Sequence, residues 1–221
     1  MIEAPSPNHD SREGQAPEIL LLHYTGMKTG AEAIARLCDP AAKVSAHYVV
    51  EEDGCVFHLV PEDRRAWHAG VSTWRGLGNV NARSIGIEIV NPGHEWGYRA
   101  FPAAQMAAVT DLALGILARQ AIPARNVIGH SDVAPVRKED PGELFDWQGL
   151  AKVGIGLWPQ RRPVQWSAEE FFAKLARYGY DVADSAAASR AFCRHFRQAK
   201  LSDVPDDQMA ALLNDLLIQV G

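Results

Sequence analysis

The longest apolar runs in the chain predict the central strands of a sheet. Residues Glu18 to Tyr24 (EILLLHY) form a continuous apolar run of strand length, which indicates a buried strand with His23 near its end. Residues Ser84 to Val90 alternate instead, with three isoleucines on one face and Gly86 and Glu88 on the other. This pattern puts the Glu88 carboxylate on a central strand.

Two further segments complete the predicted sheet. The runs Ser45 to Val50 and Cys55 to Val60 flank the acidic, glycine-containing turn Glu52-Asp53-Gly54, which is typical of a hairpin. A short strand, Asn126 to Gly129, presents His130 at its end. We expect a mixed sheet.

Helical spacing predicts the elements that cover this sheet. Residues Pro102 to Gln120 carry apolar positions at the intervals of an amphipathic helix, with proline at its start, and a shorter helix is expected from Gly30 to Cys38. The segments Val71 to Arg83 and Ser131 to Gly142 lack periodicity and are rich in Gly, Asn, Ser, Pro or charged residues, so they are predicted as loops.

A change in composition predicts a second unit. The stretch Trp158 to Pro163 (WPQRRP) has the composition of a linker, and helical segments follow at Ser167 to Tyr178, Ser185 to Gln198 and Asp206 to Gln219. The predicted fold is therefore α/β, with a mixed central sheet flanked by helices in residues 1–162 and a small three-helix module in residues 163–221.

Composition argues against some classes of partner and indicates a cellular compartment. The 221 residues carry a net charge of −5, which argues against a nucleic-acid footprint, and no apolar run is long enough for a membrane span. Residues Met1 to Gln15 lack the apolar core of a signal peptide, and the three cysteines have no CxxC spacing, so a cytoplasmic protein is expected. A periplasmic location is the alternative if a signal peptide has been removed. A monomer is expected.

Three residues suggest a metal site. His23 and His130 each follow a predicted strand, and Asp140 lies just beyond, which gives the two imidazoles and one carboxylate of an open zinc site. Glu88 would be the base. The spacing alone is weak, since these residues are remote in sequence, and histidines satisfied in the core or on the surface are the alternative.

A series of short motifs identifies a resemblance that favours the metal site. Together they span about Ile19 to Trp158, and their order resembles that of the type-2 N-acetylmuramoyl-L-alanine amidases of the peptidoglycan-recognition-protein superfamily. The motifs are LLHYTG (21–26), SAHYVV (45–50), AWHAG (66–70), NARSIGIEI (81–89), GHSDVAP (129–135) and RKEDPG (137–142).

The resemblance implies a role for each site residue. His23, His130 and Asp140 would bind Zn²⁺, Glu88 would be the general base, and Lys138 would stabilise the developing oxyanion. A bound zinc ion polarises an amide carbonyl and lowers the pKa of water, which suits amide hydrolysis. Read from the residues alone, Glu88 could instead be a solvated strand residue and Lys138 an ordinary surface charge.

Substrate contacts are predicted from five more residues. Tyr48 matches a position where some members place a tyrosine near the metal, and a groove for the sugar and stem peptide could be lined by Trp67, His68, Trp74 and Asn81. A buried structural role is the alternative for Trp67.

The C-terminal helices carry a weaker resemblance. Residues Ala191 to Arg197 (AFCRHFR) resemble the signature helix of peptidoglycan-binding modules, but Ser202 to Asp206 replace the usual Gly-rich turn. Packing against the catalytic domain is the alternative to glycan binding.

The resulting prediction is a zinc amidase that cuts the bond between the lactyl group of N-acetylmuramic acid and L-alanine in peptidoglycan or anhydro-muropeptides. In the cytoplasm it would act on imported muropeptides during cell-wall recycling. A non-catalytic peptidoglycan-recognition protein is the alternative.

Overall fold

The computed structural model describes residues 1–221, and a six-stranded mixed sheet lies at its centre. The only antiparallel pair in this sheet is the predicted hairpin of β4 (Tyr48–Val50) and β5 (Val56–His58). A separate antiparallel pair joins β2 (His9–Ser11) to β6 (Arg64–Ala66). The prediction of a mixed α/β sheet is confirmed. The strand order is β1 (Ile2–Glu3), β5 (Val56–His58), β4 (Tyr48–Val50), β7 (Ser84–Ile89), β3 (Ile19–Tyr24) and β8 (Val127–Gly129).

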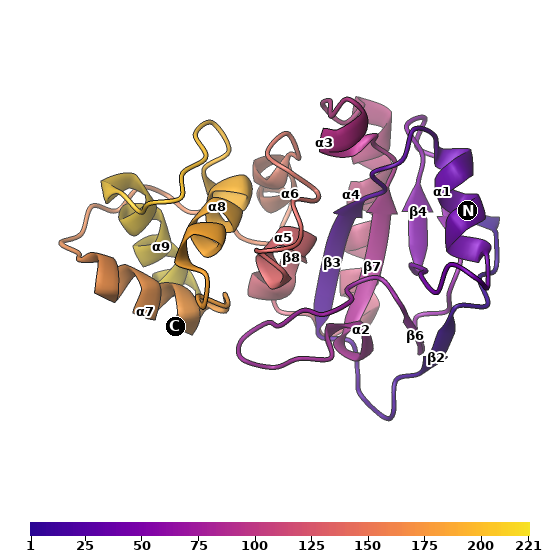
Figure 1. The fold of residues 1–221 in the computed structure, drawn as a ribbon, viewed down its shortest axis with the longest axis horizontal. Helices are drawn as coiled ribbons and strands as arrows, with labels where there is room; N and C mark the ends of the chain where they lie inside the picture. Colours follow the sequence, from indigo (N-terminus) through magenta and orange to yellow (C-terminus); the bar gives the residue numbers. More distant parts are fainter.

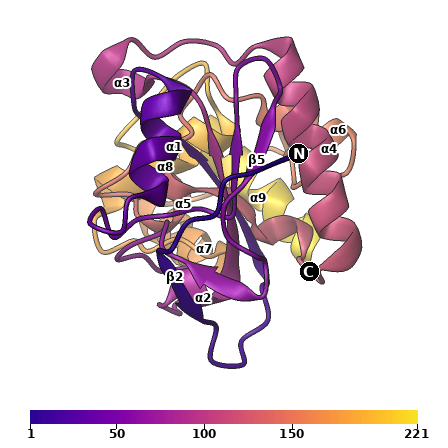
Figure 2. The ribbon, with the colours of Figure 1, turned by 90° about the vertical axis from the view of Figure 1, so that its right-hand side faces the viewer.

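The two faces of the sheet have different coverings. Alternation along β7 packs Ile85, Ile87 and Ile89 into an apolar cluster with α4 (Ala103–Arg119). Figure 2 shows α4 on one side of the sheet and α1 (Gly30–Cys38) on the other. Glu88, out of phase with the isoleucines, therefore projects on the face away from α4.

Short helices interrupt the segments between the strands. They are α2 (Val80–Arg83), α3 (Gly93–Trp96), η1 (Ala124–Asn126), α5 (His130–Val133) and α6 (Trp147–Lys152). The prediction that residues 71–83 and 131–142 are loops throughout was wrong at α2 and α5. Helices of four residues contain about one turn, so the sequence offers no periodicity by which to detect them.

The predicted C-terminal helices are present as α7 (Ala168–Tyr178), α8 (Ser185–Phe196) and α9 (Asp207–Val220). Each begins after a side-chain cap, namely Ser167, Asp184 and Asp206. Figure 1 shows the three helices gathered at one end of the molecule, beside α5 and β8. No helix in the chain combines the length and the apolar character that crossing a membrane requires.

The C-terminal helices share an apolar core with the sheet. One cluster of 22 buried residues joins Ile19, Leu21 and Ile128 of the strands to Phe192 of α8 and to residues of α7 and α9. Trp74 is fully buried in the same cluster. Residues 153–167 contain no helix or strand. The domain boundary at residues 162/163 falls in this stretch and stays a prediction.

Candidate active site

Strand pairing brings His23 and Glu88 side by side. β3 and β7 run parallel, and their register sets His23 directly opposite Glu88. Both side chains project from the face away from α4, because the adjacent residues Leu22 and Ile87 pack in the α4 cluster. Two buried strands thus supply an imidazole and a carboxyl group to one place.

His130 and Asp140 reach this place from the neighbouring strand. β8 pairs in parallel with β3, and His130 follows directly as the first residue of α5. The chain then folds back, and the backbone N–H of Ser131 donates to the carbonyl of Asp140 at 2.9 Å. This bond ties the two distant parts of the loop together.

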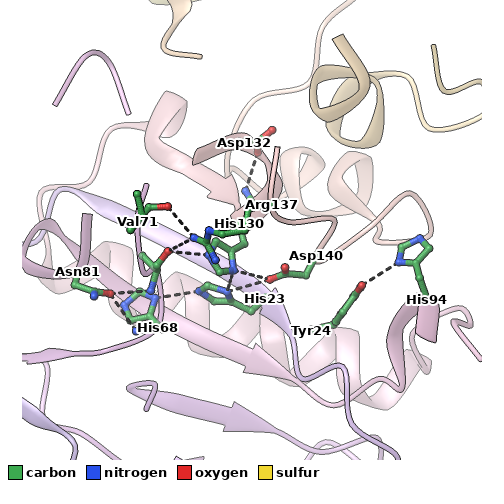
Figure 3. Close-up of polar contacts among 12 residues, drawn as sticks. His23, Tyr24, His68, Val71, Asn81, His94, His130, Asp132, Arg137 and Asp140 are labelled. Carbon is green, nitrogen blue, oxygen red and sulfur yellow. Dashed lines mark hydrogen bonds and ion pairs between the residues drawn. The ribbon is translucent and has the colours of Figure 1, made fainter. Parts of the chain in front are cut away.

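The side chains of His23, His130 and Asp140 converge on one point (Figure 3). Nδ1 of His23 lies 2.9 Å from Nδ1 of His130 and 3.0 Å from Oδ2 of Asp140, and the last two atoms are 3.1 Å apart. All three residues are buried. Two nitrogens and one carboxylate oxygen match the protein ligands of an open zinc site.

Hydrogen bonds behind the trio of His23, His130 and Asp140 leave the Nδ1 atoms of both histidines available to a cation. Nε2 of His130 donates to the backbone carbonyl of Ala69 at 3.0 Å. Nε2 of His23 lies 3.0 Å from Nδ1 of His68. A neutral imidazole that donates through Nε2 keeps its lone pair on Nδ1, which is the form that binds a metal.

The hydrogen bond from His23 continues away from the cavity. Nε2 of His68 lies 3.3 Å from Oγ of Ser84, whose hydroxyl donates to the carbonyl of Val80 at 2.6 Å. Because Ser84 gives its proton to Val80, His68 accepts from His23 and donates to Ser84. A Cβ at Gly86 would lie 2.5 Å from the His68 ring, so glycine is required there for the close approach.

Burial sets the charges within the trio. Desolvation, together with repulsion from His130, lowers the pKa of His23 to about 4. Burial by itself would raise the pKa of Asp140, but His130 and His23 outweigh it and hold that pKa well below its usual range. Near pH 7 the site therefore presents a neutral imidazole at His23 and an ionised carboxylate, as metal binding requires.

Glu88 has a buried oxygen without a partner. Its Oε2 accepts no hydrogen bond, and the residue lines a cavity together with His130 and Asp140. Burial, with repulsion from Asp140, raises the pKa of Glu88 well above its ordinary value. A carboxyl group in this setting is suited to exchanging protons with a ligand.

Two adjoining cavities meet at these residues. One has a volume of about 520 Å³ and the other of about 440 Å³, and both are lined by Thr25, Gly26, Glu88 and Lys138. The first is almost entirely polar, whereas apolar residues such as Leu37 form half of the second lining. The pair forms one groove on either side of these shared residues, and His130 and Asp140 line its first half.

Lys138 borders both cavities and has no ion-pair partner. The adjacent Glu139 pairs with His94 and Arg194 instead. The ammonium group of Lys138 is therefore available to a ligand in the groove.

Two of the five predicted substrate contacts lie behind the site, outside both linings. His68 contacts His23 as described, and Oδ1 of Asn81 accepts the backbone N–H groups of His68 and Ala69 at 3.0 and 2.7 Å. Figure 3 shows Asn81 and His68 on the far side of His23 from Tyr24. The structure gives these two residues contacts that hold the trio in place.

The other three predicted contacts, Tyr48, Trp67 and Trp74, are also absent from the cavity linings. Trp74 is fully buried, and its Nε1 donates to Oδ1 of Asn126 at 3.0 Å. Tyr48 packs in the α4 cluster, on the opposite sheet face from His23, and its hydroxyl donates to Glu62 at 2.8 Å. The backbone N–H of Trp67 donates to Ser45 at 2.8 Å.

Several cavity residues were missed by sequence reasoning. They are Tyr24, His94, Arg190 and Arg194. Tyr24 directly follows His23, and Arg190 and Arg194 are four residues apart on one face of α8, so their spacing offered a signal. That the face is turned towards the cavity follows only from the tertiary structure.

Comparison with known proteins gives a consistent family. The Amidase_2 model, described as N-acetylmuramoyl-L-alanine amidase, matches residues 13–143. N-acetylmuramoyl-L-alanine amidase AmiD of Escherichia coli (strain K12) is 36% identical over 92% of this chain and 83% of its own length. The 1,6-anhydro-N-acetylmuramyl-L-alanine amidase AmpD of Citrobacter freundii is 35% identical over 65% of this chain and 84% of its own length.

Solved structures extend the similarity to the whole fold. AmiD from E. coli in complex with the substrate anhydro-N-acetylmuramic acid-L-Ala-D-gamma-Glu-L-Lys has a TM-score of 0.84 and 35% identity, covering 97% of this chain and 98% of that one. AmpDh3 from Pseudomonas aeruginosa, in complex with anhydromuramic pentapeptide, has a TM-score of 0.83 and 32% identity, covering 97% and 95%. Both matches include the C-terminal helices.

Proposed function

The chain belongs to the N-acetylmuramoyl-L-alanine amidase family, and we propose that it works with a zinc ion held by His23, His130 and Asp140. Its reaction is hydrolysis of the amide between the lactyl group of muramic acid and L-alanine. The observation that carries the zinc proposal is the convergence of three buried ligand atoms within 3.1 Å of one another.

The donor set fits zinc on chemical grounds. Imidazole nitrogen suits zinc, whereas magnesium and calcium prefer shells made only of oxygen. The Nε2 bonds of His23 and His130 fix the tautomer that a metal ligand needs. When bound, zinc supplies polarisation of the amide carbonyl and a lowered pKa for water.

The chain's own residues supply proton transfer and charge stabilisation. Glu88 takes a proton from the attacking water and passes it to the nitrogen of the leaving L-alanine, a transfer favoured by its raised pKa. Lys138, without an ion-pair partner at the groove, stabilises negative charge on the amide oxygen.

We propose anhydro-muropeptides as the substrates. AmiD is described with an anhydro-muramyl tripeptide and AmpDh3 with an anhydromuramic pentapeptide, and both resemble this chain over nearly its whole length. The groove extends to both sides of Glu88, as required for a sugar on one side of the scissile amide and a peptide on the other.

We also propose that the protein is cytoplasmic and works as a monomer. Cys38, Cys55 and Cys193 are unpaired, which agrees with the reducing cytoplasm. All proposed ligands, the base and the cation come from one chain, so a monomer suffices for activity. Cell fractionation and light scattering test the two statements.

The proposed base is tested with the anhydro-muramyl tripeptide and mass spectrometry of the products. We expect free anhydro-muramic acid and intact tripeptide from the wild type. Glu88→Gln should lower kcat by about 10²–10⁴-fold while zinc stays bound, because a positioned acid–base group contributes about that much. The control, Glu52→Gln, removes a carboxylate that pairs with Arg99 outside the groove.

Two outcomes would overturn parts of the proposal. Wild-type turnover by Glu88→Gln would remove Glu88 from the mechanism. Binding of the tripeptide by the wild-type protein without any cleavage would identify a recognition protein instead.

A further inference from the structure

One wall of the catalytic cavity comes from the C-terminal helices. The cavity that contains His130 and Asp140 is also lined by Arg190 and Arg194 of α8. No role in the amidase reaction described above uses these two guanidinium groups. They are the only residues of the three-helix unit in this lining.

α8 is held firmly against the helix that carries His130. Buried Asp132 of α5 receives the Tyr180 hydroxyl at 2.5 Å and lies 2.7 Å from Nδ1 of His195. The His195 ring also stacks on Trp147, with 3.9 Å between centroids. The two arginines are therefore presented to the cavity by a packed interface and not by a mobile tail.

The two arginines differ in their exposure and in their ion pairs within the chain. Arg194 is 6% exposed, donates to Glu139 at 2.8 Å, and has a buried Nε without a partner. Arg190 is 40% exposed and pairs with Asp203, which is 52% exposed. The pair has two hydrogen bonds but is open to solvent, and exposed ion pairs typically contribute about 0.2–1 kcal/mol, so a ligand carboxylate can compete with Asp203 for Arg190.

The substrate's charge is on its peptide side. In the tripeptide bound to AmiD, the γ-linkage of D-glutamate leaves the α-carboxylate free, whereas the lactyl carboxyl of the sugar is consumed in the scissile amide. A guanidinium group matches a carboxylate in charge and in bidentate geometry. The half of the groove bordered by α8 therefore suits the stem peptide, and the more apolar half suits the sugar.

We infer that Arg190, supported by Arg194, binds the free α-carboxylate of the γ-linked glutamate in the stem peptide. The three-helix unit then determines substrate specificity as part of the catalytic groove. This inference rests on the proposed amidase function.

The test compares two substrates that differ in one group. They are the anhydro-muramyl tripeptide with a free glutamate α-carboxylate and the same compound with that group amidated. Wild-type kcat/KM should be at least about tenfold higher for the acid, since hydrogen bonds between charged partners are worth that much or more. Arg190→Ala should bring the acid-to-amide ratio close to one, mainly through a higher KM for the acid, and Arg190→Lys should restore part of it.

Two further variants separate recognition from folding. Asp203→Asn removes the carboxylate that pairs with Arg190. The ratio of kcat/KM for the acid to kcat/KM for the amide should then equal or exceed the wild-type ratio. A ratio near one in this variant would show that the Arg190–Asp203 ion pair has only a structural role. Arg177→Ala, at an exposed position of α7 away from both cavities, should keep the wild-type ratio.

The remaining outcomes distinguish failure of this inference from failure of the amidase function. Equal losses on both substrates in Arg190→Ala, or a wild-type ratio near one, would overturn the inference while the amidase activity stands. If the wild type cuts neither compound, the amidase function fails. Calorimetric affinities of wild type and Arg190→Ala for the uncut acid and amide then decide the recognition role: a wild-type preference for the acid that Arg190→Ala loses supports it, and equal affinities overturn it.

Discussion

At the scale of single residues, the clearest consequence concerns Lys138. It borders both halves of the groove, and its neighbour Glu139 is paired elsewhere. We expect Lys138→Met to lower kcat by about 10²–10³-fold, the usual loss when one donor to a developing oxyanion is removed. Zinc content should not change. Lys152→Met, at an exposed position of α6, is the control, and normal kcat in Lys138→Met would remove the lysine from the mechanism.

A second residue-scale prediction concerns the pH dependence of stability. His47 is buried, with its Nε2 2.8 Å from the Arg12 guanidinium, and desolvation followed by this charge lowers its pKa to about 3. Between pH 6.5 and 3, His47 is protonated in the unfolded chain but stays neutral in the folded chain. His47 therefore makes stability fall as pH falls, by up to about 1.4 kcal/mol per pH unit.

Urea unfolding at several pH values measures this effect. His47→Asn should reduce the dependence of the free energy of unfolding on pH between 6.5 and 3, compared with the wild type. His9→Asn, on the partly exposed strand β2, should keep the wild-type slope. Identical slopes for wild type and His47→Asn would contradict the buried neutral imidazole.

The sequence predicts those residues of the site that belong to recognisable motifs, but not the contacts between them. His23, His130 and Asp140 follow from strand ends and from the family resemblance, and the structure brings them together. The bond between His68 and His23 could not be predicted, because it depends on the space that Gly86 leaves on a neighbouring strand. An aromatic or imidazole ring in a motif does not reveal from sequence whether it faces the substrate or supports a ligand.

At the scale of elements, the contact between α5 and α8 is the feature that joins the site to the C-terminal helices. Asp132 is buried and caps the start of α5 through the backbone N–H of Gly129 at 2.7 Å. The other carboxylate oxygen of Asp132, Oδ1, accepts a hydrogen bond from the Tyr180 hydroxyl. Tyr180→Phe should therefore reduce the free energy of unfolding by about 1.5–3 kcal/mol, the value of a hydrogen bond to a charged group.

Denaturant unfolding checks this value against a matched control. Tyr178→Phe removes a hydroxyl from a buried tyrosine of the same cluster that makes no side-chain hydrogen bond, so its effect should be smaller. Equal destabilisation by the two variants would mean that the Asp132 contact contributes nothing specific.

Element prediction succeeded where periodicity was long and failed where it was short. The helix predicted at 102–120 is α4 at Ala103–Arg119, whereas α5 went undetected because it has four residues. The hairpin strands were predicted longer than they are, since apolar residues continue beyond the paired Tyr48–Val50 and Val56–His58. Such residues are buried by tertiary packing without belonging to the ladder.

At the scale of the whole molecule, the C-terminal helices and the sheet share one core and one groove. The sequence predicted three helices, but their contacts with Trp74 and the strands join residues far apart in the sequence, such as Trp74 and Tyr178. No local pattern encodes such contacts, so the position of α8 at the catalytic cavity could not be predicted. The proposed activity nevertheless depends above all on His23, His130 and Asp140.

Metal content measured together with activity therefore tests the zinc site itself. We expect about one zinc per chain, loss of tripeptide release after removal of the metal by a chelator, and recovery when zinc is added back. His23→Ala should lose both the zinc and the activity. Full turnover by the metal-free protein, or a His23→Ala variant that keeps stoichiometric zinc and wild-type activity, would show that His23, His130 and Asp140 do not hold a catalytic zinc ion.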